Sequence, residues 1–181
     1  MAAIEYSGEI PAERASWEEL HVQIAAIHAN ERLMQILGEL PDEILLLNQN
    51  RQIIYVNEVA LKCLGVQDPA EVYGCRPGEV FGCVHASRGP GGCGTSEHCS
   101  FCGGLRVIMN SLNGYADVQK CRIARAEGAA PLDMIVHGIP INLLGMSLSL
   151  VCCQPSASEQ NKQVAVASFR VQRYAAYLEE I

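Results

Sequence analysis

The feature that most limits how this chain can fold is a glycine-rich stretch in its middle that carries four cysteines. Residues 82–104 contain seven glycines together with Cys83, Cys93, Cys99 and Cys102, and they include few large side chains. A connection of this length is rarely ordered without support from elsewhere. Because side-chain packing alone is insufficient, we expect the four sulfur atoms to order this segment by binding a common metal or cluster.

The spacing of these cysteines suits a four-sulfur site. They are separated by nine, five and two residues, so Cys99 and Cys102 form a Cys-x-x-Cys pair, and the glycine-rich arm allows Cys83 and Cys93 to complete the ligand set. Four thiolates favour zinc or an iron–sulfur cluster. The pattern matches neither a zinc ribbon nor a ferredoxin motif, and disulfide bonds between these cysteines are the competing explanation.

Other polar residues of this segment are secondary candidates. His85 and His98 adjoin two of the cysteines, so either histidine could replace a thiolate in a site with three cysteines and one histidine. The sequence favours them as residues beside the ligands or facing solvent. Arg88 and Arg106 would offset negative charge if they approached the sulfurs, but exposed positions are expected for both.

Cysteine content and charge restrict the setting in which the protein acts. Nine cysteines, four of them clustered, indicate metal binding in a reducing compartment. Residues 1–20 lack the apolar run of a secretory signal, and no segment reaches the ~18 apolar residues of a membrane span. The net charge of −7 disfavours nucleic acid and membrane surfaces as partners. We therefore expect a cytoplasmic protein.

The first half of the chain predicts a helix followed by a β-hairpin. Ser16 and Glu19 form a capping box before an apolar stripe, so a helix is expected from Ser16 to about Leu40. Two apolar runs in residues 43–57, with a polar turn between them, indicate two strands. A short helix over residues 58–64, closed by Gly65, and a helical turn over residues 68–71 are expected next.

The second half predicts one helix, three strands and a final helix. Residues 105–112 place apolar side chains on one helical face, and Asn113-Gly114 ends that helix. Strands are expected at residues 116–125, 131–144 and 146–154. After Pro155 apolar residues recur at heptad-like spacing up to Ile181. Scattered cysteines in apolar surroundings are interpreted as small buried residues: Cys63, Cys75, Cys121, Cys152 and Cys153.

This order of elements, and the segment IIYVNEVALKCLGVQDPAEVYG at residues 53–74, resemble the PAS family. The segment RPGEVFGCVHASRGPGGCGTSEHCSFCG at residues 76–103 resembles the cysteine-rich insert of some PAS sensors attached to bacterial histidine kinases. We expect this chain to differ from those sensors in having no kinase module after Ile181.

The resemblance implies an α+β fold, with a five-stranded antiparallel sheet, helices on one face, and flanking helices at both ends. It divides the chain into an N-terminal flanking helix (1–40), a sensor domain (41–154) with the cysteine loop (82–104), and a C-terminal signalling helix (155–181). It also implies a homodimer formed through the flanking helices and a downstream signalling protein as partner.

The favoured function is a sensor whose four cysteines hold an iron–sulfur cluster, preferably [4Fe–4S], that reports redox state, oxygen or nitric oxide. The alternative is a PAS interaction module with a structural zinc site. A thiol oxidoreductase using Cys99 and Cys102 is disfavoured because the pair lacks a strand-then-helix setting. No catalytic constellation is recognisable, so we do not expect an enzyme.

Overall fold

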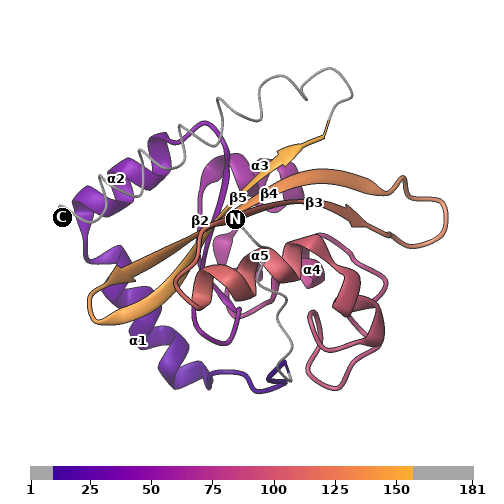
Figure 1. The fold of residues 1–181 in the computed structure, drawn as a ribbon. Coiled ribbons are helices and arrows are strands. Elements are labelled where there is room, and N and C mark those ends of the chain that lie inside the picture. Colours follow the sequence, from indigo (N-terminus) through magenta and orange to yellow (C-terminus); the bar gives the residue numbers. More distant parts are fainter. Residues whose placement is uncertain (1–9, 157–181) are drawn as a thin grey trace.

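The computed structural model describes residues 10–156, which form one antiparallel sheet with helices on both of its faces (Figure 1). The elements follow in this order: α1 (Trp17–His28), α2 (Glu31–Glu39), β1 (Glu43–Leu47), β2 (Ile53–Val56), α3 (Glu58–Leu64), η1 (Pro69–Glu71), α4 (Pro77–Val80), η2 (Glu97–Phe101), α5 (Gly103–Leu112), β3 (Asp117–Ile123), β4 (Leu132–Leu143) and β5 (Met146–Pro155).

The sheet confirms the predicted α+β fold. Its strand order is β2-β1-β5-β4-β3, and all neighbouring strands are antiparallel. The β4–β5 hairpin turns at Leu144 and Gly145, as predicted, with φ angles of 52° and 76°. Positive φ at both central residues is the turn geometry that follows the natural twist of a hairpin.

Alternation along the strands divides the core into two parts. In β5, Leu150 and Cys152 face one side of the sheet, whereas Val151 and Cys153 face the other. We call the first side the outer core, which α1 and α2 cover, and the second the inner core, which α3, α4 and α5 cover (Figure 1). The helices contribute four fully buried leucine and isoleucine residues to the outer core: Leu20, Ile27, Leu33 and Leu37.

The prediction of one continuous helix over residues 16–40 is wrong. The helix breaks after His28, and Asn30 begins α2 by accepting a hydrogen bond from the Leu33 N–H at 3.1 Å. Asparagine is a favoured residue at the start of a helix because its side chain satisfies an otherwise unpaired N–H group. The break lets both short helices pack on the same face of the sheet. The capping box of Ser16 and Glu19 is confirmed.

Asn57 joins the first hairpin to α3. Its side-chain oxygen accepts hydrogen bonds from the N–H groups of Ile44 and Ala60, at 3.1 and 3.0 Å. Its amide nitrogen donates to the carbonyls of Leu40 and Asp42. The side chain is 1% exposed, so its polar groups need these partners. One residue therefore caps α3 and fixes the start of β1.

The inner face depends on close contact between α5 and the sheet. At Gly138 of β4, a Cβ atom would lie 2.5 Å from Cγ1 of Val107 in α5, so only glycine fits there. The close approach at Gly138 places α5 directly over β3 and β4.

α3 ends at Gly65, as predicted, with φ of 70°.

The predicted C-terminal helix falls on residues 157–181, which lie outside the described residues. Pairing of the flanking helices in a homodimer therefore stays a prediction, as do the three domain boundaries. Within residues 10–156, no helix combines the length and the apolar character needed to cross a membrane.

Candidate functional site

A cavity of about 260 Å³ lies between the inner face of the sheet and the cysteine loop, residues 82–104. Its walls come from β3, β4, β5, α4, α5 and the loop itself. Six cysteines line it: Cys83, Cys93, Cys99, Cys102, Cys121 and Cys153. All four predicted ligands therefore line one cavity, although they come from separate parts of the loop.

The short helix α4 positions two of the four. The N–H of Cys83 donates to the carbonyl of Gly78 at 2.8 Å, and the N–H of Cys93 donates to Oε1 of Glu79 at 3.2 Å. A Cβ atom on Gly78 would lie 2.6 Å from Sγ of Cys93 and 3.4 Å from Cβ of Cys83. The absence of a side chain at Gly78 therefore lets both cysteines pack closely against α4.

The other two predicted ligands lie where η2 leads into α5. Ser96 precedes η2, and its hydroxyl lies 3.2 Å from Sγ of Cys99 and does not cap a backbone N–H group. Cys102 is the residue before α5, and its Sγ lies 3.9 Å from Sγ of Cys121 on β3. The two sulfurs of the Cys-x-x-Cys pair therefore contact different partners.

The surroundings of Cys102 favour its thiolate form. A hydrogen bond from the Cys121 thiol, followed by the N–H groups of Leu105 and Gly104 in the first turn of α5, lowers the pKa of Cys102. The same hydrogen bond, together with burial, raises the pKa of Cys121, which keeps its proton. The first turn of α5 thus helps to stabilise a thiolate in the cysteine loop.

Cys93 experiences the opposite effect. Burial, joined by smaller effects of negative charge on Cys102, Cys99 and Cys83, raises the pKa of Cys93 to about 12. Metal ligation requires the thiolate. A cation in the cavity would therefore offset the electrostatic cost of ionising Cys93, since it would attract all four sulfurs at once.

The four sulfurs share a cavity without forming a complete coordination shell. Within residues 10–156, no group of three or more His, Cys, Asp or Glu side chains is placed to hold a metal ion. The donor chemistry suits a thiophilic metal or an iron–sulfur cluster, but the sulfurs would have to move closer together. That movement falls on the cysteine loop, because the sheet fixes the opposite wall of the cavity.

Both candidate histidines lie on the cavity wall. The rings of His85 and His98 stack, with centroids 4.1 Å apart and an angle of 24° between their planes. Nδ1 of His85 is buried and has no hydrogen-bond partner within the described part of the chain. The two rings thus form a polar patch beside the sulfurs, and their role as substitute ligands stays a prediction.

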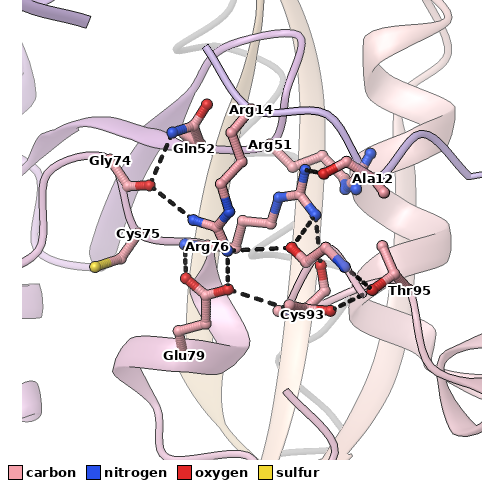
Figure 2. A network of polar contacts seen from close by, with 12 residues as sticks. Ala12, Arg14, Arg51, Gln52, Gly74, Cys75, Arg76, Glu79, Cys93 and Thr95 are labelled. Carbon is pink, nitrogen blue, oxygen red and sulfur yellow. Dashed lines mark hydrogen bonds and ion pairs between the residues drawn. The ribbon is translucent and has the colours of Figure 1, made fainter. Parts of the chain in front are cut away.

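Arg76 connects the cysteine loop to residues 11–15, which we call the N-terminal arm (Figure 2). The side chain is 1% exposed. Its guanidinium donates to five backbone carbonyls: Asn50 (3.0 Å), Gly91 (2.8 Å), Cys93 (3.3 Å), Ala12 (3.3 Å) and Glu13 (2.7 Å). Burial lowers the pKa of Arg76 to about 10, so it stays a cation at neutral pH and binds three segments together.

Glu79 completes this network. Its Oε2 accepts a hydrogen bond from the N–H of Arg76 at 2.9 Å, its Oε1 accepts from the N–H of Cys93, and the same carboxylate pairs with Arg14 (Figure 2). Arg14 also donates to the carbonyl of Gly91 at 3.2 Å. The N-terminal arm is therefore fixed to α4 by a charge pair and to the cysteine loop by a contact with the Gly91 carbonyl.

Sequence analysis did not identify several of the residues that form this site. Arg88 is exposed, as expected, whereas Arg106 is half-buried, contrary to expectation. The cations on the cavity wall include Arg51 and Arg76. An isolated arginine before a proline carries no periodic signal that would indicate burial.

Cys121 and Cys153 are buried, as predicted, but they also line the cavity. Their inward positions on β3 and β5 were the available signal. The prediction of burial is wrong for Cys63, which is exposed on α3, and Cys75 is only half-buried.

Comparison with solved structures identifies the fold of this chain. No protein-family model matches the chain, and no curated protein matches it. The Rhodobacter sphaeroides LOV protein superposes with a TM-score of 0.52 at 11% identity, over 86% of this chain and 77% of that one. The PAS domain of Bordetella pertussis BvgS gives 0.50 at 12% identity, over 81% and 98%. At such identities the likeness concerns the fold, and the chain has the PAS fold.

Proposed function

We propose that this protein is a cytoplasmic PAS-type sensory and signalling protein that holds an iron–sulfur cluster, preferably [4Fe–4S], through Cys83, Cys93, Cys99 and Cys102. The observation that carries the proposal is the convergence of these four cysteines on one cavity beneath a PAS sheet. Bound there, the cluster would supply a link sensitive to oxygen, nitric oxide or redox state.

The contacts of the loop suggest how such a signal would leave the cavity. Gly91 and Cys93 bind Arg76 through their carbonyls, and Arg76 binds the N-terminal arm that leads into α1. If the metal or cluster left its cysteine ligands, the cysteine loop would become less ordered, and its contacts with Arg76 would weaken. The flanking helices would then pass the change to a second copy of the chain and to a downstream signalling protein.

Metal analysis of protein purified without oxygen tests the proposal. We expect iron and acid-labile sulfide in similar amounts, and we expect each single change of Cys83, Cys93, Cys99 or Cys102 to serine to reduce both. Cys63→Ser is the matched control, because Cys63 is exposed on α3 and does not line the cavity. Stoichiometric zinc without iron would replace the proposal with the structural zinc alternative. Full iron content in all four variants would refute the ligand set.

A further inference from the structure

We propose that Cys102 and Cys121 form a dithiol site that hydrogen peroxide converts into a disulfide. This site goes beyond the proposed function, because it needs no metal and uses a cysteine outside the proposed ligand set. The two sulfurs are 3.9 Å apart and in direct contact, whereas a disulfide bond is about 2.05 Å long. Side-chain rotation and a small movement at the start of α5 would close the gap.

The backbone on both sides favours this pairing. Cys121 is 6% exposed and lies within β3, where it pairs in register with Met134 of β4, so the sheet fixes its position. Cys102 lies outside the sheet, at the residue where η2 ends and α5 begins. The disulfide would therefore join a rigid strand to the beginning of a helix.

Two consecutive glycines make the contact possible. A Cβ atom on Gly104 would lie 3.2 Å from Sγ of Cys121 and 3.8 Å from Sγ of Cys102. A Cβ atom on Gly103 would lie 2.1 Å from the carbonyl oxygen of Lys120, inside any allowed contact distance. Glycine in a first helical turn lowers helix stability, and here it allows α5 to approach β3 closely enough for the two sulfurs to meet.

The chemistry balances with peroxide as the oxidant. Both sulfurs line the cavity, so a small oxidant that enters the cavity reaches them. The sulfur of Cys102 attacks one peroxide oxygen, the O–O bond breaks, and a sulfenic acid and one water form. The sulfur of Cys121 then attacks the sulfenic sulfur and releases a second water. Two thiols thus lose two electrons and two protons to one peroxide molecule.

This disulfide and a metal compete for the same atom, because Cys102 is also a proposed ligand. Oxidation would remove one ligand from the cavity and hold it against β3. The pair would therefore record exposure to peroxide after a metal has left the site. Reduction by a cellular dithiol would restore the ligand.

Disulfide mapping of the full chain tests the proposal. The protein is reduced, stripped of metal with a chelator under nitrogen, treated with one equivalent of hydrogen peroxide, alkylated and digested with trypsin. Cleavage after Lys120 and Arg122 releases Cys121 in a two-residue fragment, and cleavage after Arg88 and Arg106 releases loop peptide 89–106. We expect the fragment to be attached to this peptide at Cys102, as read by tandem mass spectrometry.

Variants separate this site from its neighbours. Cys102→Ser and Cys121→Ser should each abolish the linkage, while Cys99→Ser and Cys153→Ser should leave it unchanged, although both of these cysteines line the same cavity. Predominant linkage among Cys83, Cys93, Cys99 and Cys102, or alkylated Cys121 after peroxide treatment, would overturn the proposal. The wild-type map decides the matter even if a variant fails to fold.

The result of the peroxide experiment does not depend on whether the protein binds an iron–sulfur cluster. Iron content measured on oxygen-free Cys121→Ser protein reports on the proposed ligand set, because that variant keeps all four proposed ligands. The peroxide map reports on the sulfur pair alone. Each proposal can therefore fail while the other stands.

Discussion

Arg76 shows how much of this structure rests on single buried side chains. Its five carbonyl partners belong to the first hairpin, the cysteine loop and the N-terminal arm. A guanidinium presents its donors in a flat, fixed arrangement, which lysine does not reproduce. Arg76→Lys would keep the charge but leave several buried carbonyls without a partner, at a cost of about 1–3 kcal/mol for each group.

We therefore expect Arg76→Lys to lower the free energy of unfolding by about 3 kcal/mol or more. Urea denaturation followed by circular dichroism measures this change. Arg88→Lys is the matched control, because Arg88 is exposed, and it should change stability by less than about 0.5 kcal/mol. Equal urea midpoints for the two variants would contradict this account of Arg76.

His137 on β4 makes stability depend on pH. It is 1% exposed, and its Nε2 has no hydrogen-bond partner among the described residues. Burial lowers the pKa of His137 below 6.5, against a smaller opposing effect of Asp42. The unfolded chain therefore binds this proton more readily than the folded one, so the contribution of neutral His137 is complete above pH 6.5 and decreases as the pH falls towards the folded pKa.

We expect stability to fall more steeply in the wild type than in His137→Gln when the pH is lowered from about 7.5 to about 5.5. Glu43 acts in the opposite direction, because burial raises its pKa, and comparing the two proteins cancels its contribution. Thermal melts at closely spaced pH values give the two curves. Parallel curves would show that His137 does not titrate differently on folding.

At the scale of elements, two glycines in helices have opposite roles. A Cβ on Gly78 of α4 would clash with the sulfur of Cys93, whereas a Cβ on Gly38 of α2 would meet nothing within 4 Å. We expect Gly78→Ala to destabilise the protein by about 1–3 kcal/mol, since it overpacks the contact with the loop. Gly38→Ala should stabilise it by about 0.4–1 kcal/mol by restricting the unfolded chain. Denaturation curves that shift in the same direction would contradict this assignment.

The elements that the sequence predicted well are those with local signals. The strands, α3 and the β4–β5 turn carry apolar runs, a closing glycine and paired turn residues, so their positions follow from neighbours in sequence. The break at Asn30 was missed because the apolar stripe continues across it, and only packing of both helices on the sheet makes the break favourable. The asparagine was the sequence signal for it.

The candidate site was predictable in part for the same reason. The four clustered cysteines drew attention to the loop, and they line the cavity. Cys121 comes from β3, 19 residues after Cys102, and the role of Arg76 depends on carbonyls up to 64 residues away in the chain. Such contacts are set by the tertiary fold, which no local pattern records.

At the scale of the whole molecule, Glu79 links regions distant in sequence. It binds Arg14 of the N-terminal arm, Cys93 of the loop and the backbone at the start of α4. Loss of its charge should weaken the arm and the loop together, because both depend on the same carboxylate. Glu71→Gln is the matched control, because it removes the same charge from the exposed turn η1. The Glu71 side chain makes no such contacts among the described residues.

We expect Glu79→Gln to raise hydrogen exchange at the N–H groups of Ala15 and Cys93, while exchange at Val136 in the sheet stays unchanged. In the wild type, the N–H of Ala15 donates to Gln52 at 2.7 Å and that of Cys93 donates to Glu79 at 3.2 Å. Mass spectrometry of exchanged peptides, with Glu71→Gln in parallel, measures both regions. Faster exchange in the loop with an unchanged arm would show that the two are not coupled.

The adjacent residues Cys152 and Cys153 give each half of this molecule its own native spectroscopic reporter. Cys152 lies under α1 and α2, and Cys153 lines the cavity, although they are neighbours on β5. The infrared S–H stretch of a thiol responds to its immediate surroundings, and removing one cysteine at a time assigns each band. A molecule entering the cavity would then alter the Cys153 vibration, whereas a rearrangement of the first two helices would alter that of Cys152.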